Sequence, residues 1–416
     1  METFDTLVIG GGPAGLMAAI RASSLGQKVA IAEKNHSVGE KLRLSGRGRC
    51  NFTNAEADID TFISKYGDKG KFLYSAFSKF GPLRTREYFS HLGVKYVEER
   101  GKRIFPKEGG SQRVLDALLM QCKKYGVKIM RSTPVQGLKV RNNHIDRIIA
   151  ANDEYSAGKY ILSTGGMSYP KTGSTGDGYE FARRIGHTIV PLYPALVPVK
   201  TRETWPKIAS GCDLRNVRIT VFADGKKVAE RFGEMEFTNF GVSGPIIMEL
   251  SRHVPDWQVK HEDGSETELQ FVLDMKPTLT NEILSDRIKH DIAKHPGGKF
   301  SGLVRGLVPE KMLKLFLELS DIPSDKPTDY MSDKEISDTV KLLKNIRMNV
   351  NGLWSFNNAM VTRGGVSLKE VEPSTMRSKL CDNLYLAGEI LDLDGPSGGF
   401  NLQVSWSTGY VAGSVE

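Results

Sequence analysis

Residues 8–15 read Val8-Ile9-Gly10-Gly11-Gly12-Pro13-Ala14-Gly15. An apolar run of strand type, Phe4 to Ile9, leads into the glycines, and a segment of helical composition, Leu16 to Ile20, follows them. The next apolar run, Lys28 to Ala32, completes a strand–helix–strand unit with its glycine-rich turn after the first strand. The pattern predicts an α/β fold with a doubly wound, mainly parallel sheet.

The glycines of this turn have separate physical roles. Gly10 permits the tight turn, Gly12 lets the backbone approach a pyrophosphate, and Gly15 allows the helix to pack closely. The start of the helix offers unpaired N–H groups to phosphates. Glu33, at the end of the second strand, provides a carboxylate that accepts hydrogen bonds from ribose hydroxyls and repels a 2′-phosphate. The turn therefore predicts a site for FAD or NAD rather than NADP.

The other end of the chain decides between FAD and NAD. Leu384 to Ala387 reads as a strand that ends in Gly388-Glu389, and residues 398–403 open a last helix. FAD is long enough to need both ends of the chain, with the acid facing its ribityl and pyrophosphate groups and the helix start facing its ring. Reduced flavin is negative at N1 and C2=O, which a helix N-terminus stabilises. We expect FAD, held noncovalently because no attachment motif is found, with NAD(P)H as a transient reductant.

The pattern of secondary structure that the sequence indicates changes after Thr188. Short, proline-bounded strands are expected in place of strand–helix–strand spacing, and residues 280–345 have a helical pattern. We expect residues 1–190 and 355–416 to form one discontinuous FAD-binding domain, and residues 191–354 to form an inserted β-rich substrate or cap domain with helices at about 280–345. The expected strands of the insert are Leu196–Lys200, Val217–Phe222, Val228–Phe232 and Phe271–Met275.

Composition and charge set limits on partners and location. The 416 residues contain no apolar run near the ~20 residues that a membrane helix needs, and the first residues lack a secretion-signal pattern. Four scattered cysteines without a paired motif favour neither a disulfide framework nor a redox dithiol, and no metal-ligand spacing stands out. We expect a cytoplasmic protein. Its net charge of +8 permits nucleic-acid binding, but acids are interleaved with the basic residues, so we expect a small-molecule substrate rather than a nucleic-acid partner.

The polar loop at residues 41–54 is rich in hydrogen-bond donors. Lys41, Arg47, Arg49 and Asn51 either bind phosphates and flavin carbonyls, which is the favoured interpretation, or polarise a substrate carbonyl. Lys41, Arg47 and Asn51 are therefore also the candidate catalytic residues. Cys50 is interpreted as a packed thiol rather than a nucleophile, because the sequence places no histidine beside it.

These segments resemble the YhiN/BaiN-like flavoproteins, a family that includes a bile-acid ene-reductase and an aminoacetone oxidase. The resemblance implies FAD as cofactor and an inserted β-barrel domain with helices. It also implies that Thr164-Gly165-Gly166 lies near the adenosine and pyrophosphate, and that Val135 lies on the strand that meets adenine. The resemblance covers nearly the whole chain and rests on residues 8–15, Lys41 with residues 45–54, residues 164–166 and 172–178, residues 361–366, and residues 387–403.

Two positions have more than one interpretation. Family members often carry a further glycine where this chain has Arg47, so a cationic side chain is expected to point toward the flavin or the substrate. The glycine-rich run at residues 173–178 either caps the following helix, with Asp177 at the N-cap, or lies near the flavin.

The predicted function is that of an FAD-dependent oxidoreductase that transfers a hydride between a small organic substrate and flavin N5. The flavin would be reoxidised by oxygen or exchange electrons with NAD(P)H, as in an amine oxidase or an ene-reductase. The alternatives are an RNA-modifying flavoenzyme and a non-enzymatic, flavin-binding redox sensor. The predicted cofactor-binding residues are Gly10, Gly12, Pro13, Ala14, Gly15, Glu33, Lys34, Lys41, Gly46, Arg49, Cys50, Asn51, Val135, Thr164, Gly165, Gly166, Gly388, Glu389, Gly399, Phe400, Asn401 and Leu402.

Overall fold

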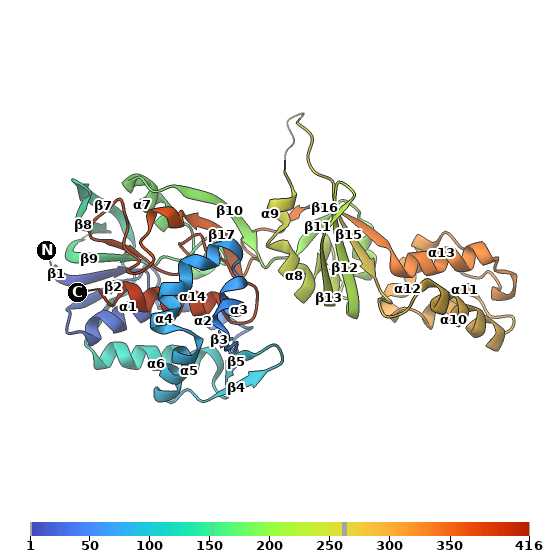
Figure 1. Cartoon of the computed structure of the whole chain (residues 1–416), viewed down its shortest axis with the longest axis horizontal. Coiled ribbons are helices and arrows are strands. Elements are labelled where there is room, and N and C mark those ends of the chain that lie inside the picture. Colours follow the sequence, from blue (N-terminus) through green and yellow to red (C-terminus); the bar gives the residue numbers. More distant parts are fainter. Residues whose placement is uncertain (1, 152, 260–263, 416) are drawn as a thin grey trace. The chain divides into compact units, whose positions relative to one another are not determined.

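The structure, a computed structural model, describes residues 2–151, 153–259 and 264–415. The chain forms two compact units (Figure 1). The first unit comprises Met1–Pro194 and Ala359–Glu416, and the second comprises Ala195–Asn358. The domain boundaries predicted from the sequence, between residues 190 and 191 and between residues 354 and 355, fall in the segments that connect these units. The roles predicted for the two parts, FAD binding for the first and substrate binding or capping for the second, remain predictions.

A seven-stranded sheet forms the centre of the first unit. Its central strands are parallel, whereas its last strands form an antiparallel meander. The doubly wound, mainly parallel architecture expected from the glycine-rich turn is thereby confirmed. In spatial order the strands are β6 (Lys128–Met130), β2 (Val29–Ala32), β1 (Glu2–Ile9), β9 (Asp153–Leu162), β8 (His144–Ala150) and β7 (Val135–Arg141), with β18 (Leu384–Leu386) also paired to β9.

The first and last helices of the chain pack against each other (Figure 1). They are α1 (Pro13–Ser24) and α14 (Phe400–Ala412). A Cβ at Gly409 would collide with the carbonyl of Ala14, so the absence of a side chain there permits the close approach. The glycine-rich turn that precedes α1 and the glycine-rich ending that precedes α14 therefore belong to one body. Two further helices of this unit are α6 (Gly110–Lys124) and α7 (Asp177–Ile185).

A layer of short helices and strands between residues 40 and 106 was not predicted, and residues 41–54 had been expected to form a polar loop. Its aromatic side chains pack on α14, with the rings of Phe62 and Phe400 4.7 Å apart. The indole N–H of Trp406 donates to the Phe52 carbonyl at 2.8 Å. This layer therefore supports the start of α14. The elements concerned are α2 (Glu40–Leu44), β3 (Thr53–Asn54), α3 (Ile59–Ser64), η1 (Gly67–Leu73), α4 (Tyr74–Phe80), α5 (Pro82–His91), β4 (Tyr96–Glu99) and β5 (Arg103–Pro106).

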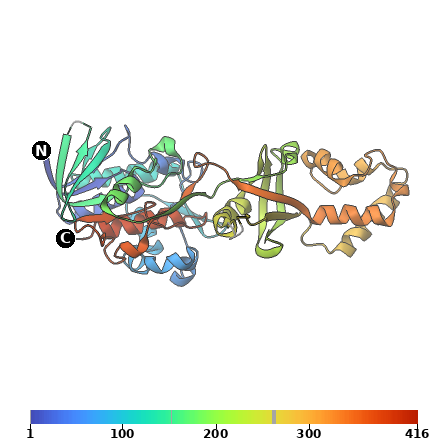
Figure 2. The same ribbon diagram turned by 90° about the horizontal axis from the view of Figure 1, so that it is seen from above.

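The second unit is a closed six-stranded barrel, and the helices of residues 281–344 gather at one end of it (Figure 2). The β-barrel-like insert with helices expected from the resemblance is confirmed. Every strand pair described in this unit is antiparallel, so its described residues contain no second Rossmann unit. The strands in barrel order are β11 (Val199–Thr201), β14 (Gly241–Ser243), β13 (Lys226–Thr238), β12 (Asp213–Ala223), β15 (Leu269–Asp274) and β16 (Ile346–Leu353).

Most helices of the insert occupy the expected region of the sequence, but α8 and α9, at residues 245–257, were not predicted. The main group spans residues 281–344, whereas β14 and β16 of the barrel were not predicted. The helices are α8 (Pro245–Ser251), α9 (Val254–Trp257), α10 (Asn281–Lys294), α11 (Phe300–Arg305), α12 (Glu310–Ser320) and α13 (Asp333–Lys344), with short turns η3 (Trp205–Ala209) and η4 (Thr328–Tyr330).

Two neighbouring strands carry the chain out of the first unit and back into it. They are β10 (Ile189–Ala195) and β17 (Val361–Val366), which form a two-stranded sheet. A short turn, η2 (Pro170–Thr172), precedes α7, and η5 (Leu368–Glu370) follows β17. Because the outgoing and returning strands are hydrogen-bonded, the insert leaves the first unit from one place.

Two searches of the described residues gave no candidate. None of the helices described combines the length and the apolar character needed to cross a bilayer. Among the same residues, no three His, Cys, Asp or Glu side chains are grouped so that they could hold a metal ion.

Candidate functional site: a dinucleotide cradle in the first unit

The glycine-rich turn has the geometry that a pyrophosphate needs. Gly12 is the N-cap of α1, and no side chain caps the helix. A Cβ built at Gly12 meets nothing within 4 Å, whereas one at Gly15 would collide with the Gly10 carbonyl. Gly10 has a φ of 102°, which a residue with a side chain rarely adopts. The first turn of α1 thus keeps unpaired N–H groups beside backbone that is open to a ligand.

Glu33 lies beside this turn and is buried. One carboxylate oxygen accepts a hydrogen bond from the Gly11 N–H at 2.8 Å, and the other accepts one from the Asn35 N–H at 2.8 Å. Burial raises the pKa of Glu33, although these two hydrogen bonds act in the opposite direction. A carboxylate has about four acceptor positions, so ribose hydroxyls can still be accepted. Lys34 is turned away, because its ammonium donates to Asp177 at 2.6 Å.

The glycine-rich run at residues 173–178 does supply the N-cap of α7, but the placement of Asp177 at the cap was wrong. Gly176 is the N-cap and Asp177 is the first helical residue. The carboxylate of Asp177 accepts instead from Lys34 and from the hydroxyl of Thr175. Residues 173–178 therefore begin α7 and are also joined to Lys34, which follows β2.

A second buried network surrounds Glu389 at the end of β18. Its carboxylate accepts from the Lys41 ammonium at 2.5 Å, the Ser168 hydroxyl at 2.9 Å and the Thr362 N–H at 2.8 Å. These partners come from α2, from the loop after β9 and from β17. Lys41 and Glu389, both predicted as cofactor-binding residues, therefore meet as a partly buried ion pair in the structure.

Asn51 joins the polar loop to the start of α14. In one orientation the side-chain amide of Asn51 forms hydrogen bonds with three backbone groups. Its Nδ2 donates to the carbonyls of Ile104 and Thr53, and its Oδ1 accepts from the Gly399 N–H at 3.0 Å. Gly399 itself has a φ of 97°, and a Cβ there would collide with the backbone of Thr53. Asn51 thus has a positioning role within the protein. Its amide N–H groups and its amide oxygen already form hydrogen bonds with backbone groups, so they do not require a substrate as partner.

Cys50 is a packed thiol, as interpreted from the sequence. It is fully buried, and burial raises the pKa of its thiol to about 12 although a hydrogen bond with Ser45 lowers it. A thiol with such a pKa is not a nucleophile at neutral pH. Its backbone φ of 60° and the φ of 58° at Gly46 show that the loop curls tightly here.

The two arginines of the loop differ in their environments. Arg49 forms an ion pair with Glu99, and its guanidinium lies 4.3 Å from the centre of the Phe105 ring. Arg47 is exposed and makes no hydrogen bond or ion pair with the described residues. Its φ of 57° is a conformation that glycine adopts without strain. Lys41 and Asn51, the other two candidate catalytic residues of the loop, bind protein groups. Arg47 is therefore the candidate whose side chain is free to contact a substrate.

The end of β9 continues the cradle. The hydroxyl oxygen of Thr164 is buried and has no hydrogen-bond partner. A Cβ at Gly166 would collide with the Thr362 hydroxyl, so only glycine fits there. Val135 begins β7, two residues after Thr133, whose N–H donates to the Glu33 carbonyl at 2.8 Å. Val135 thus begins a strand near Glu33, whereas Thr164 and Gly166 lie in the loop that follows β9, with Thr164 beside Gly10 and Gly166 beside Glu389.

The start of α14 is shaped by its own side chains. No side chain caps the helix. Asn401 accepts from the Gly395 N–H at 2.8 Å and donates to the Gly395 carbonyl at 2.9 Å, which fixes the preceding loop. Phe400 is buried, and Leu402 is partly buried. Gly388 is joined to the same helix, because its N–H donates to the Thr408 hydroxyl at 2.9 Å.

The residues of the first unit fit a flavin dinucleotide. Two uncapped helix starts, α1 and α14, lie on helices that pack together, and Thr164, whose hydroxyl has no hydrogen-bond partner, lies in the loop after β9 beside Gly10. When FAD is bound, Gly12 and the first turn of α1 would hold its pyrophosphate and Glu33 its adenosine ribose. Glu389 and the start of α14 would hold the ribityl and ring portions.

A family model described as the HI0933-like protein Rossmann domain matches residues 4–415. The chain belongs to the HI0933-like family. A 3-dehydro-bile acid delta(4,6)-reductase from Clostridium scindens is 32% identical over 98% of this chain and 97% of its own length. A ribosomal RNA dihydrouridine synthase from Haemophilus influenzae is 29% identical over 98% of this chain and 97% of its own length.

Solved structures agree with the fold of this HI0933-like protein. The 3-ketosteroid delta1-dehydrogenase from Sterolibacterium denitrificans superposes with a TM-score of 0.53 at 14% identity, covering 99% of each chain. Identity at this level shows the fold alone. Family and fold together identify the HI0933-like chain as an FAD-dependent oxidoreductase with a Rossmann-type domain, as the sequence analysis predicted.

The sequence analysis missed two members of the Glu389 network. Thr362 belongs to a segment that supported the family resemblance, but no role had been assigned to it. Ser168 had no signal in the sequence, because its hydroxyl meets Glu389 across 221 residues of chain. A third missed contact is the ion pair of Lys69 with the buried Asp392 at 2.5 Å.

Proposed function

We propose that this protein reduces a carbon–carbon double bond conjugated to a carbonyl group, in a small organic molecule. The observation that carries the proposal is the pair of full-length relatives named for saturating reactions on unlike substrates. A delta(4,6) double-bond system next to a 3-oxo group and the double bond of the uracil ring are both conjugated to a carbonyl. We propose for this chain the chemistry that the two reactions share, reduction of a conjugated double bond, and not either of the two substrates.

The residues of the loop at 41–54 suit this reaction. FAD in its reduced form, when bound, supplies a hydride. Conjugate reduction places developing negative charge on the substrate carbonyl oxygen, which a positioned cation stabilises. We assign this role to Arg47, whose guanidinium has no partner among the described residues. Lys41 and Asn51 act as positioning residues, since both side chains already bind protein groups.

Anaerobic flavin spectroscopy tests the proposal. Enzyme reduced with dithionite is mixed with cyclohexenone or a 3-oxo-4-ene steroid, and oxidised enzyme is mixed separately with primary amines. We expect the conjugated ketone to restore the oxidised flavin spectrum, and the amines to leave it unchanged. Bleaching of oxidised flavin by an amine, with no reoxidation by any conjugated ketone, would show an amine oxidase instead.

Two single-residue variants distinguish a specific role of Arg47 from the effect of removing any positive charge. Arg47→Gln should slow reoxidation by the conjugated ketone by about tenfold to a hundredfold, because a charge-assisted contact to the developing oxyanion is lost. Arg184→Gln, which removes an exposed arginine of α7, serves as the control. Equal rates in both variants would remove Arg47 from the mechanism.

A second candidate function is the reduction of a uracil ring within RNA. The relative from Haemophilus influenzae weakens the expectation that nucleic acid is not a partner. The first unit also contains 34 Lys and Arg against 25 Asp and Glu, whereas the insert contains 23 against 24, so the positive charge resides in the unit with the cradle. Four of these cations, Lys41, Arg43, Arg47 and Arg49, lie in one loop without an acid.

Ribosomal RNA provides the direct test of this alternative. RNA from a strain that lacks the gene is incubated with the purified enzyme and NADPH, and dihydrouridine is measured by mass spectrometry of the nucleosides. Formation of dihydrouridine, together with binding that weakens steeply with salt, would favour RNA as the substrate. No product on RNA, with turnover of conjugated ketones, would favour the small-molecule function.

A further inference from the structure

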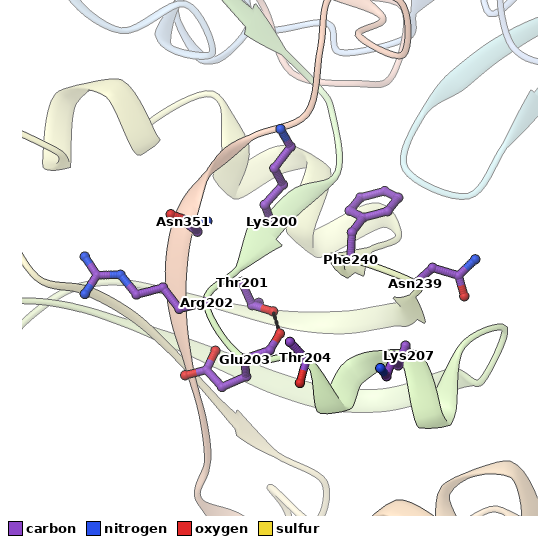
Figure 3. Close-up of a pocket in the computed structure, with 9 residues that line it drawn as sticks. All are labelled: Lys200, Thr201, Arg202, Glu203, Thr204, Lys207, Asn239, Phe240 and Asn351. Carbon is purple, nitrogen blue, oxygen red and sulfur yellow. Dashed lines mark hydrogen bonds between the residues drawn. The ribbon is translucent and has the colours of Figure 1, made fainter.

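A hollow of about 400 Å³ lies on the barrel of the second unit and is lined by residues of that unit alone (Figure 3). Its walls come from β11 and the residues that follow it, from η3, from the loop between β13 and β14, and from β16. A volume of this size suits a ligand of nucleotide dimensions. The lining residues are Lys200, Thr201, Arg202, Glu203, Thr204, Lys207, Asn239, Phe240 and Asn351.

The charge of this hollow is positive although its unit is not. Lys200, Arg202 and Lys207 contribute three cations, and among the described residues none of them has an ion-pair partner. The one acid, Glu203, has its carboxylate occupied by the backbone N–H and the side-chain amide of Asn349 at 2.8–3.0 Å. Since the unit as a whole has 23 basic and 24 acidic residues, the excess of cations is local.

An aromatic stack forms part of the same site. The ring of Phe240 stacks on that of Trp354, with ring centroids 3.3 Å apart. The ammonium of Lys200 lies 5.2 Å from the centre of the Trp354 ring. Lys200 and Phe240 extend to the same side of the hollow, whereas Arg202 and Lys207 lie toward opposite ends of it (Figure 3). A flat ring placed on Phe240 would therefore have the ammonium of Lys200 close to its substituents.

Two amide side chains complete the polar lining. Asn239 and Asn351 are exposed, and the structure gives their side chains no hydrogen-bond partner among the described residues. An amide offers both donors and an acceptor, which is the pattern needed to meet the polar edge of a heterocyclic base. Unpaired cations, an aromatic platform and free amides together fit one class of ligand.

We propose that this hollow binds a nucleotide, with the phosphate held by Lys200 and the base stacked on Phe240. The ligand chemistry is a phosphate ester that carries a flat, polar ring. Two sources share that chemistry: a free dinucleotide such as the reductant, and a nucleotide within an RNA strand. The inference goes beyond the proposed function, because reduction of a conjugated ketone by chemically reduced enzyme does not require this site.

Calorimetric titration of the FAD-saturated holoprotein with ADP tests the inference. Saturation with FAD keeps ADP out of the glycine-rich turn. We expect saturable binding that weakens about tenfold in Lys200→Gln, since a charge-assisted contact to phosphate is lost. Lys226→Gln, which removes an exposed lysine at the start of β13 outside the hollow, should leave the affinity unchanged.

The aromatic part of the site has its own test. Phe240→Leu should weaken binding of ADP but not of inorganic pyrophosphate, which has no ring. Competition then distinguishes the two sources: displacement of ADP by NADP⁺ indicates a free dinucleotide, and displacement by an oligoribonucleotide indicates an RNA strand. The inference is overturned if ADP does not bind saturably, or if Lys200→Gln and Lys226→Gln change its affinity equally.

Discussion

Glu33 shows how one side chain serves both the fold and the cofactor. Its carboxylate holds the glycine-rich turn through Gly11 and the end of β2 through Asn35. The sequence was sufficient to find Glu33, because its position after a strand–glycine–helix unit is a local pattern. The two backbone contacts could not be predicted, since they depend on how the turn and the strand end approach each other.

Substitution of Glu33 should weaken binding of FAD. In Glu33→Gln the charge-assisted hydrogen bonds to the ribose hydroxyls become neutral ones, and we expect the dissociation constant for FAD to rise at least about tenfold. Fluorescence titration of the apoprotein measures it. Glu180→Gln, on an exposed position of α7, is the matched control. Full flavin retention by Glu33→Gln through extended dialysis would contradict the assignment.

Cys50 should resist alkylation in the folded protein. With a thiol pKa of about 12, only about one molecule in ten thousand carries a thiolate at pH 8. Iodoacetamide at that pH should therefore leave Cys50 unmodified, as measured by peptide mass spectrometry. The unfolded protein, in which the thiol recovers its ordinary pKa, supplies the positive control. Rapid labelling of native Cys50 would mean that the loop at 41–54 opens in solution.

At the scale of elements, the start of α14 depends on its contact with β3. A side chain at Gly399 would meet the Thr53 backbone and would also strain a φ of 97°. We expect Gly399→Ala to lower the free energy of unfolding by about 1–3 kcal/mol and to lower flavin content. Gly186→Ala is the matched control, because Gly186 has a φ of 107° but nothing within 4 Å of an added Cβ. Unaltered flavin content in Gly399→Ala would separate this helix start from the cofactor.

A buried histidine joins the exit of α7 to the segment after β17. The ring of His187 contacts Glu370 at 3.1 Å through Nδ1 and Ser378 at 2.8 Å through Nε2. Burial lowers the pKa of His187, although Glu370 acts in the opposite direction. The unfolded chain therefore binds a proton more readily, and stability falls as the pH drops below the ordinary histidine pKa of about 6.5.

The midpoint of thermal unfolding should show this dependence. Between pH 8 and pH 5 the wild-type protein should lose more of its melting temperature than His187→Asn, in which the titrating group is gone. His36→Asn, which removes an exposed histidine, should follow the wild type. Identical slopes for the wild type and His187→Asn would show that His187 is protonated with equal ease in both states.

Some elements were readable from the sequence and others were not. The helix α1 could be placed because it follows the glycine-rich turn and has a helical composition, and α10–α13 because residues 280–345 have a helical pattern. The layer from α3 to α5 was missed because its aromatic residues are spaced by contacts with α14 rather than by a simple period. The pair Lys41 and Glu389 spans 348 residues of chain, so their contact had no local signal, although each residue was predicted separately.

At the scale of the whole molecule, the two ends of the chain form one unit and the middle forms another. The family match and the Rossmann-type fold of FAD-dependent enzymes support cofactor binding by the unit that contains both ends of the chain. The insert has its own buried core, made from the barrel and its helices. We infer that flavin binding needs the first unit alone, whereas recognition of the substrate or of a nucleotide involves the insert.

The flavin content of a chain without the insert tests this account most directly. Residues 195–358 are replaced by a short Gly-Ser linker, which the pairing of β10 with β17 makes geometrically feasible. The account predicts a folded protein, by circular dichroism, that binds near-stoichiometric FAD and releases it on acid precipitation. A folded variant that binds FMN or no flavin, or that keeps flavin on the precipitated polypeptide, would contradict it.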